Sequence, residues 1–133
     1  MAEPKTQKTK ASVAAFIAAL ENDTRRADAK VIDKMYREIT GEKPAMWGPT
    51  MIGYGSFDLP SGTWPRAAFS PRKASLVLYV LSDYKGRAGL LKRLGKHKTG
   101  KVCLYINKLA DVDLAVVREL MQRCWDRMQA KYP

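Results

Sequence analysis

The stretch Ser75–Leu81, with the sequence SLVLYVL, is apolar at nearly every position. A strand that packs against other structure on both faces has this composition, whereas a strand with one face in water alternates apolar and polar residues. We therefore predict that Ser75–Leu81 is the central strand of a sheet. Tyr79 in this strand, and Tyr105 in a later one, interrupt apolar runs and are interpreted as core or rim aromatics.

The segments around this strand predict further strands and turns. Met51–Phe57 is a glycine-bearing strand, Ser61-Gly62 reverses the chain into a strand at Trp64–Phe69, and Met46–Pro49 is a turn. Val102–Ile106 is another apolar strand.

Helical spacing of apolar residues predicts four helices. Ser12 is placed to cap a short first helix, the second runs from Thr24 to a stop at Gly41, and the third spans Arg87–Leu94 and stops at Gly95. Asp111 is the expected N-cap of the last helix, whose apolar seam is Leu114, Val117, Met121, Cys124 and Met128. This order predicts a single α+β domain with helices on one face of a mainly antiparallel sheet.

Composition limits the domain count and the surroundings of the chain. A chain of 133 residues suits one domain, which we place at residues 11–131 behind a flexible basic arm at residues 1–10. The formal net charge of +11 attracts anions of every kind. No apolar run suggests a signal core or a membrane span, and we expect Cys103 and Cys124 to be buried thiols in the cytoplasm.

The loop Gly95–Lys101, with the sequence GKHKTGK, nearly matches a nucleotide-binding P-loop. Val102 stands where a hydroxyl must bind magnesium. The predicted context also differs, because a P-loop joins a strand to a helix N-terminus, whereas this loop leaves a helix and enters a strand. Nucleotide hydrolysis is therefore not expected.

Between Lys85 and Lys101 the chain has seven Lys or Arg residues and no acid. Such a run is either a solvated face or an anion site built from Lys96, Lys98 and Lys101, with Thr99 donating. His97 is the only histidine and is interpreted as an exposed loop residue rather than a base or metal ligand. The segments Trp64–Arg66 and Phe69–Lys73 place guanidinium groups beside aromatics, a mixture that suits phosphates and bases as well as a plain sheet edge.

Several motifs in this order resemble the bacterial YdhG-like domain family of unknown function, over roughly Lys8 to Arg127. The motifs are MWGP at 46–49, GYG at 53–55, FSPRK at 69–73, LGKHKTGK at 94–101, CLYI at 103–106 and LADVD at 109–113. The resemblance implies a compact α+β domain with an antiparallel sheet, similar in outline to frataxin. It also implies, through one branch, an intracellular iron chaperone, although 13 acids against 24 bases do not favour a carboxylate iron site.

The family motifs concentrate candidate ligand-binding residues in loops that border strands. They are Arg66, Arg72, Lys73, Lys96, His97, Lys98, Thr99 and Lys101, with Trp47 and Tyr54 as an apolar wall. We expect a non-enzymatic domain that binds an anionic small molecule or an acidic protein. Iron binding and nucleic-acid binding are the alternatives, and no catalytic residue, metal ligand set or cofactor is assigned.

Overall fold

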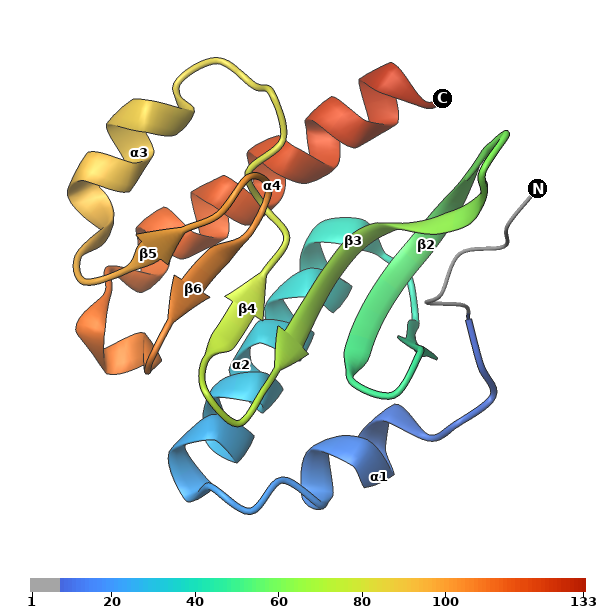
Figure 1. The fold of residues 1–133 in the computed structure, drawn as a ribbon. Helices are drawn as coiled ribbons and strands as arrows, with labels where there is room; N and C mark the ends of the chain where they lie inside the picture. The colour runs from blue at the N-terminus through green and yellow to red at the C-terminus, as the bar shows by residue number, and fades with distance from the viewer. Residues whose placement is uncertain (1–7) are drawn as a thin grey trace.

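The computed structural model describes residues 8–133, which form an antiparallel sheet covered by helices on one face (Figure 1). The strands lie in the order β1-β2-β3-β4-β6-β5, and every neighbouring pair is antiparallel. The α+β class and the antiparallel sheet predicted from the sequence are thus confirmed. The strands are β1 Pro44–Trp47, β2 Met51–Leu59, β3 Gly62–Pro71, β4 Leu76–Leu78, β5 Lys98–Thr99 and β6 Leu104–Ile106.

The helices are α1 Val13–Ala18, α2 Asp23–Thr40, α3 Arg87–Leu94 and α4 Leu114–Lys131. The side chain of Ser12 accepts a hydrogen bond from the Ala15 N–H and caps α1, as predicted. The predicted end of α2 at Gly41 and the predicted bounds of α3 are also confirmed. Capping residues and helical spacing therefore located most of the helix ends.

The prediction that Asp111 caps the last helix is wrong. The N-cap of α4 is Asp113, whose Oδ1 accepts from the Ala115 and Val116 N–H groups. Asp111 instead closes a 3-10 turn, Leu109–Asp111, and its carbonyl accepts from the Lys96 N–H. Both aspartates suit a cap in isolation, and the packing of this turn against the end of α3 decides between them.

Two strand predictions need correction. Only Leu76–Leu78 of the predicted strand Ser75–Leu81 is a β-strand, because the chain leaves β3 after Tyr79, and the buried Val80 and Leu81 follow outside any strand. Met46–Trp47, predicted as a turn, pairs with β2, and the turn begins at Gly48. The apolar composition of Ser75–Leu81 therefore predicted the burial of these residues correctly, but it predicted their strand pairing only in part.

The main core lies between the sheet and the helices α2 and α4. Ile32 and Tyr36 of α2 and Leu120 of α4 are buried there with Leu76 and Leu78 of β4. Alternate residues of a strand point to opposite faces, so Val77 points away from this core. Three buried apolar residues lie outside the main core cluster, namely Trp47, Ala68 and Val77.

Three further expectations from the sequence concern the N-terminal arm, the two cysteines and membrane-spanning helices. Residues 1–7 of the predicted arm lie outside the described residues, while Lys8 pairs with Trp47 and the Thr9 N–H donates to the Met46 carbonyl. Cys103 is half-buried, Cys124 is buried, and the two are unpaired. Within residues 8–133 no helix has the length and hydropathy to cross a membrane.

Candidate functional site

The face of the sheet opposite the helices is the candidate site. Strand register places four residues in one row across the sheet, in the order Ser70, Val77, Tyr105 and Lys98. This row points away from the residues that face α2 and α4. Figure 1 shows α2 and α4 behind the sheet and no helix in front of β3, β4 and β6. We call this surface the open face and define it by Ser70, Arg72, Val77, Tyr79, Lys98 and Tyr105.

Arg72 is held across the open face by neighbouring side chains. Its Nη2 donates to the Tyr79 hydroxyl at 2.7 Å, and its Nε donates to Ser70 Oγ at 3.3 Å. Ser70 Oγ in turn donates to the Thr50 carbonyl at 2.8 Å. Partial burial raises the pKa of Tyr79 while the Arg72 charge opposes this shift, so Tyr79 stays a neutral partner at physiological pH. Arg72 Nη1 makes no hydrogen bond within residues 8–133.

Arg25 of α2 supports Arg72 from the helix side. Its guanidinium donates to the Arg72 carbonyl and, at 3.1 Å, to the Asn107 carbonyl. Arg25 is only 6% exposed, and this burial lowers its pKa, against a raising influence from Asp28. The Asp28 carboxylate also accepts from the Leu109 N–H at 3.0 Å. Arg25 and Asp28 thus tie the end of β3 and the segment after β6 to α2.

The basic loop, Gly95–Lys101, packs against neighbouring residues and has its own hydrogen bonds. Gly95 has φ +113°, and a Cβ there would lie 2.5 Å from the Asp111 carbonyl oxygen, so the position requires glycine. His97 Nδ1 lies 2.7 Å from the Gly95 carbonyl oxygen, and the Gly100 N–H donates to the Cys103 carbonyl at 2.8 Å. The loop follows α3, contains β5 and leads into the strand β6, as predicted, whereas a P-loop leads into a helix N-terminus.

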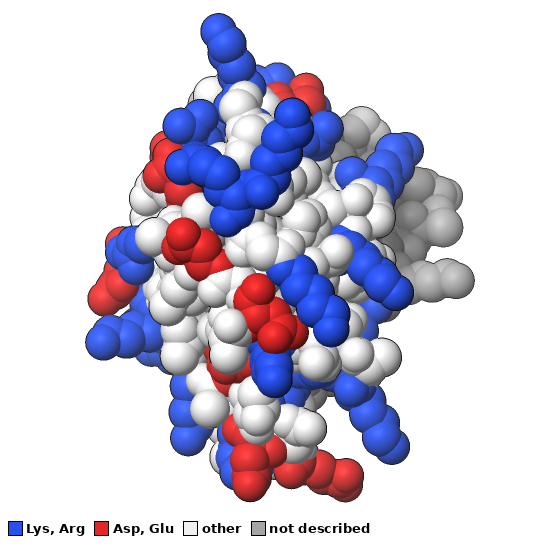
Figure 2. Space-filling model, turned by 90° about the vertical axis from the view of Figure 1, so that its left-hand side faces the viewer, with Lys and Arg blue, Asp and Glu red and all other residues white. Residues whose placement is uncertain are grey.

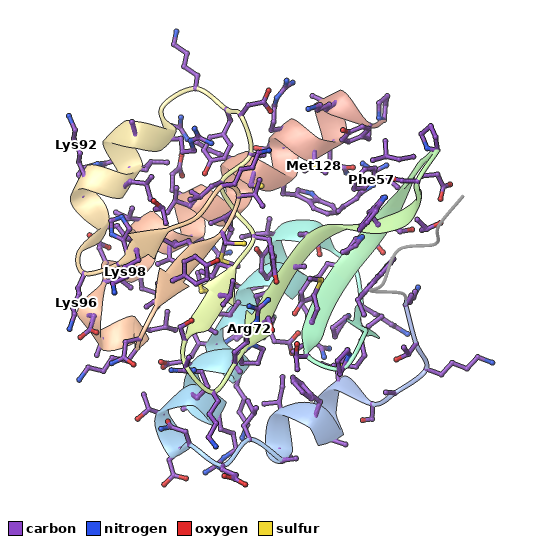
Figure 3. All side chains as sticks on the ribbon, viewed as in Figure 1. Phe57, Arg72, Lys92, Lys96, Lys98 and Met128 are labelled. Carbon is purple, nitrogen blue, oxygen red and sulfur yellow. The ribbon has the colours of Figure 1, made fainter. Side chains whose placement is uncertain are left out.

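The basic loop borders a hollow of about 470 Å³ at the β5 edge of the sheet. Figure 3 shows Lys96 and Lys98 at this edge and Arg72 near the ends of β3 and β4. Lys96, His97 and Lys98 line the hollow together with Ala74, Ser75, Tyr105, Ile106 and Asn107. Two ammonium groups, an imidazole, two hydroxyls and an amide therefore line one hollow that an anion can enter.

Within the described residues, the cations of the open face and the basic loop lack the carboxylate partners that several cations of α2 and α4 have. Every salt bridge found in residues 8–133 uses a side chain of α2 or α4. No carboxylate of the described chain lies within 4.0 Å of the basic groups of Arg72, Lys73, Lys96, Lys98 or Lys101. Asp83 is the only acid between Leu59 and Ala110. Figure 2 shows basic groups separated by neutral and acidic surface on one side of the molecule, rather than a single continuous basic patch.

The structure does not bring all the predicted site residues together. Tyr54 lies in the core, where its hydroxyl donates to Asp33 at 2.5 Å and burial raises its pKa, so it forms no wall of the open face. Arg66 donates to the Ser56 carbonyl at 2.9 Å and to the Met128 carbonyl at 3.4 Å, away from Arg72. Trp47 is buried over Gly53, where an added Cβ would lie 2.5 Å from its ring.

Three further predicted residues lie close to the open face without joining the hollow. Lys73 is exposed and borders a separate hollow of about 550 Å³ with Arg25 and Arg72. Thr99 and Lys101 are exposed in the basic loop. Of the predicted residues, Lys96, His97 and Lys98 therefore line the hollow at the β5 edge, and Arg72 stands on the same face of the sheet.

Sequence reasoning missed Ser70, Tyr79, Tyr105, Asn107 and Arg25 as site or supporting residues. Alternation could have found the tyrosines, because Tyr105 lies between Leu104 and Ile106, both of which face the core. Tyr79 likewise lies between Leu78 and Val80. No local pattern predicts the role of Arg25, whose partners are 47 and 82 residues away in the chain.

A second, apolar cleft of about 480 Å³ opens where β3 separates from the chain after β4. Phe57 and Met128 lie near its rim in Figure 3, and Trp64 and Val102 also line it. Ser82 Oγ lies 3.1 Å from Cys124 Sγ beside this cleft. Burial raises the pKa of the Cys124 thiol, against the lowering effect of the Ser82 hydrogen bonds.

The fold and the site define an α+β domain whose uncovered sheet face carries unpaired cations beside tyrosines. The described part of the chain has no group of three or more His, Cys, Asp or Glu side chains arranged to hold a metal ion. Comparison of the chain with family models, curated proteins and solved structures found no match.

Proposed function

We propose that this chain is a non-enzymatic domain that binds an anionic ligand, either a small molecule or an acidic partner, through the open face and the basic loop. The observation that carries the proposal is the contrast in charge partners. Six cations of α2 and α4 have a carboxylate within 4.0 Å, whereas Arg72, Lys96 and Lys98 have no carboxylate partner in the described chain. Like charges gathered without counter-charges favour an external anion.

The arrangement also suits binding better than catalysis. Arg72 is held by Ser70 and Tyr79, and its backbone is held by Arg25, so its guanidinium is positioned before a ligand arrives. Each remaining donor can make a charge-assisted hydrogen bond to a phosphate or carboxylate. We name no nucleophile or general base on this face and therefore propose no reaction.

Titration of pyrophosphate tests this proposal, followed by backbone amide NMR shifts of the whole chain. We expect the largest shifts at Lys96–Lys98 and around Arg72. The triple variant R72Q/K96Q/K98Q should lose at least about tenfold in affinity, a change of about 1.4 kcal/mol. The control K30Q/K34Q/K43Q removes the same charge from exposed positions outside the open face. Equal affinity of the two triple variants would contradict the proposal.

We also propose that the chain belongs to the YdhG-like family and acts in the cytoplasm. The ordered motifs of the sequence support the first statement, and the two unpaired thiols support the second. Microscopy of the tagged full chain expressed in a bacterium tests the location, and periplasmic signal would contradict it.

A further inference from the structure

We infer that the anion bound by the open face is a single-stranded nucleic acid, with a base stacked on Tyr105 and phosphates bound by Lys98 and Arg72. This inference rests on the proposed anion-binding function and deepens it by naming the ligand class. It assigns a role to the aromatic ring of Tyr105, which a site for a simple phosphate or carboxylate would leave unused.

The strand register sets the spacing of the three groups. Tyr105 on β6 pairs directly with Lys98 on β5. On its other side Tyr105 pairs with Val77, and Val77 pairs with Ser70, whose hydroxyl accepts from Arg72. Neighbouring strands lie about 4.8 Å apart, so the row from Lys98 to Ser70 spans about 14 Å with the aromatic ring inside it. A cation thus stands on each side of a π surface, as a backbone with phosphates on both sides of a stacked base requires.

The aromatic group is also positioned before binding. A Cβ at Gly100 would lie 3.2 Å from the Tyr105 ring, so the ring already packs on this glycine of the basic loop. Val77, the residue between Ser70 and Tyr105 in this row, is 0% exposed although no helix covers it in Figure 1. Tyr105 itself remains partly exposed. A base can therefore stack without the sheet having to repack.

The same geometry favours single strands over duplexes. Bases in a duplex are already stacked on each other, and proteins read them with a helix or ribbon that enters a groove. The open face is a sheet surface, and its six defining residues come from strands, from the turn after β3 and from the position directly after β4 rather than from a projecting helix. Sheets that bind single strands use aromatic side chains as stacking platforms within a basic surface.

Fluorescence anisotropy with a labelled oligothymidylate of about 12 nucleotides, within the usual site sizes of such surfaces, tests the inference. We expect binding that weakens steeply between about 50 and 200 mM salt, as phosphate contacts require. Y105L should lose about fivefold or more in affinity through the lost stacking, whereas Y105F should keep it. An abasic oligomer of equal length and a duplex should both bind more weakly than the oligothymidylate.

The outcomes separate this inference from the proposed function. If the abasic oligomer binds as well as oligothymidylate and Y105L binds like the wild type, base stacking is excluded, although anion binding stands. Tighter binding of the duplex would also overturn the inference. If pyrophosphate and both oligomers fail to bind, the proposed function fails with it. The abasic comparison uses wild-type protein, so it decides the matter even if Y105L fails to fold.

Discussion

The two faces of the same sheet use their side chains in opposite ways. On the helix-covered face Leu76 and Leu78 of β4 pack into one apolar core, and four arginines of α2 and α4 pair with carboxylates of the same two helices. On the open face Val77 of the same strand is also fully buried, but this face carries tyrosines and cations without carboxylate partners among residues 8–133. One face is built for stability, and the other retains unused charge and hydrogen-bonding capacity.

The largest expected effect is the loss of stability when a core side chain of the helix-covered face is truncated. Leu78→Ala removes a fully buried side chain from the core and should lower the free energy of unfolding by about 2–5 kcal/mol. Val77→Ala, one residue away, should cost less, because exposed side chains of the open face can move into the space. Urea denaturation of both variants measures the difference. A larger loss at Val77 would mean that the open face carries the stability.

Arg25 connects the two faces, and its loss should have the next largest effect. Arg25→Met leaves the Arg72 and Asn107 carbonyls without this donor and should cost about 1–3 kcal/mol of stability. It should also weaken pyrophosphate binding, because the backbone of Arg72 loses the support of Arg25. Arg26→Met is the control, since Arg26 is more exposed and donates to Leu20 and Asp23 instead. Unchanged pyrophosphate affinity in Arg25→Met would remove Arg25 from the support of the site.

Gly53→Ala tests the packing at the far end of the open face. The added Cβ would lie 2.5 Å from the Trp47 ring and 2.8 Å from Pro65 Cβ, so the ring must move. Overpacking of this kind costs about 1–3 kcal/mol. We expect the midpoint of urea unfolding to fall and the tryptophan emission to shift to longer wavelength as Trp47 becomes wetter. Gly89→Ala, with nothing within 4 Å of the new Cβ, is the control.

The smallest expected effect is a difference in reaction rate between the two thiols, Cys103 near the open face and Cys124 on the helix side. Cys124 is buried and its pKa is raised, so at a given pH it holds less of the reactive thiolate. Cys103, partly exposed beside Tyr105, should react first with a thiol reagent near neutral pH. The slow thiol should speed up as the pH rises towards the raised pKa of Cys124. Equal rates for C103S and C124S would contradict this contrast.

Much of the covered face could be predicted from the sequence, because helical spacing and capping are local properties. Ser12, Gly41 and Gly95 mark helix ends by their own conformational preferences. The open face was harder to predict, because Tyr54 and Tyr105 both lie in predicted strands and nothing local to either one says which face of the sheet it occupies. Tyr54 lies in the core and donates to Asp33, while Tyr105 lies on the open face, and the registers of different strands set this difference.

The sequence by itself determined the class of fold, the excess of positive charge and the basic loop between α3 and β6. These follow from composition and from patterns a few residues long. Only the tertiary structure decided that Arg72, Tyr105 and Lys98 share one face and that Tyr54 and Arg66 lie elsewhere. The physical reason is that strand pairing joins residues far apart in the chain, and a shift of one residue in register turns a side chain from one face of the sheet to the other.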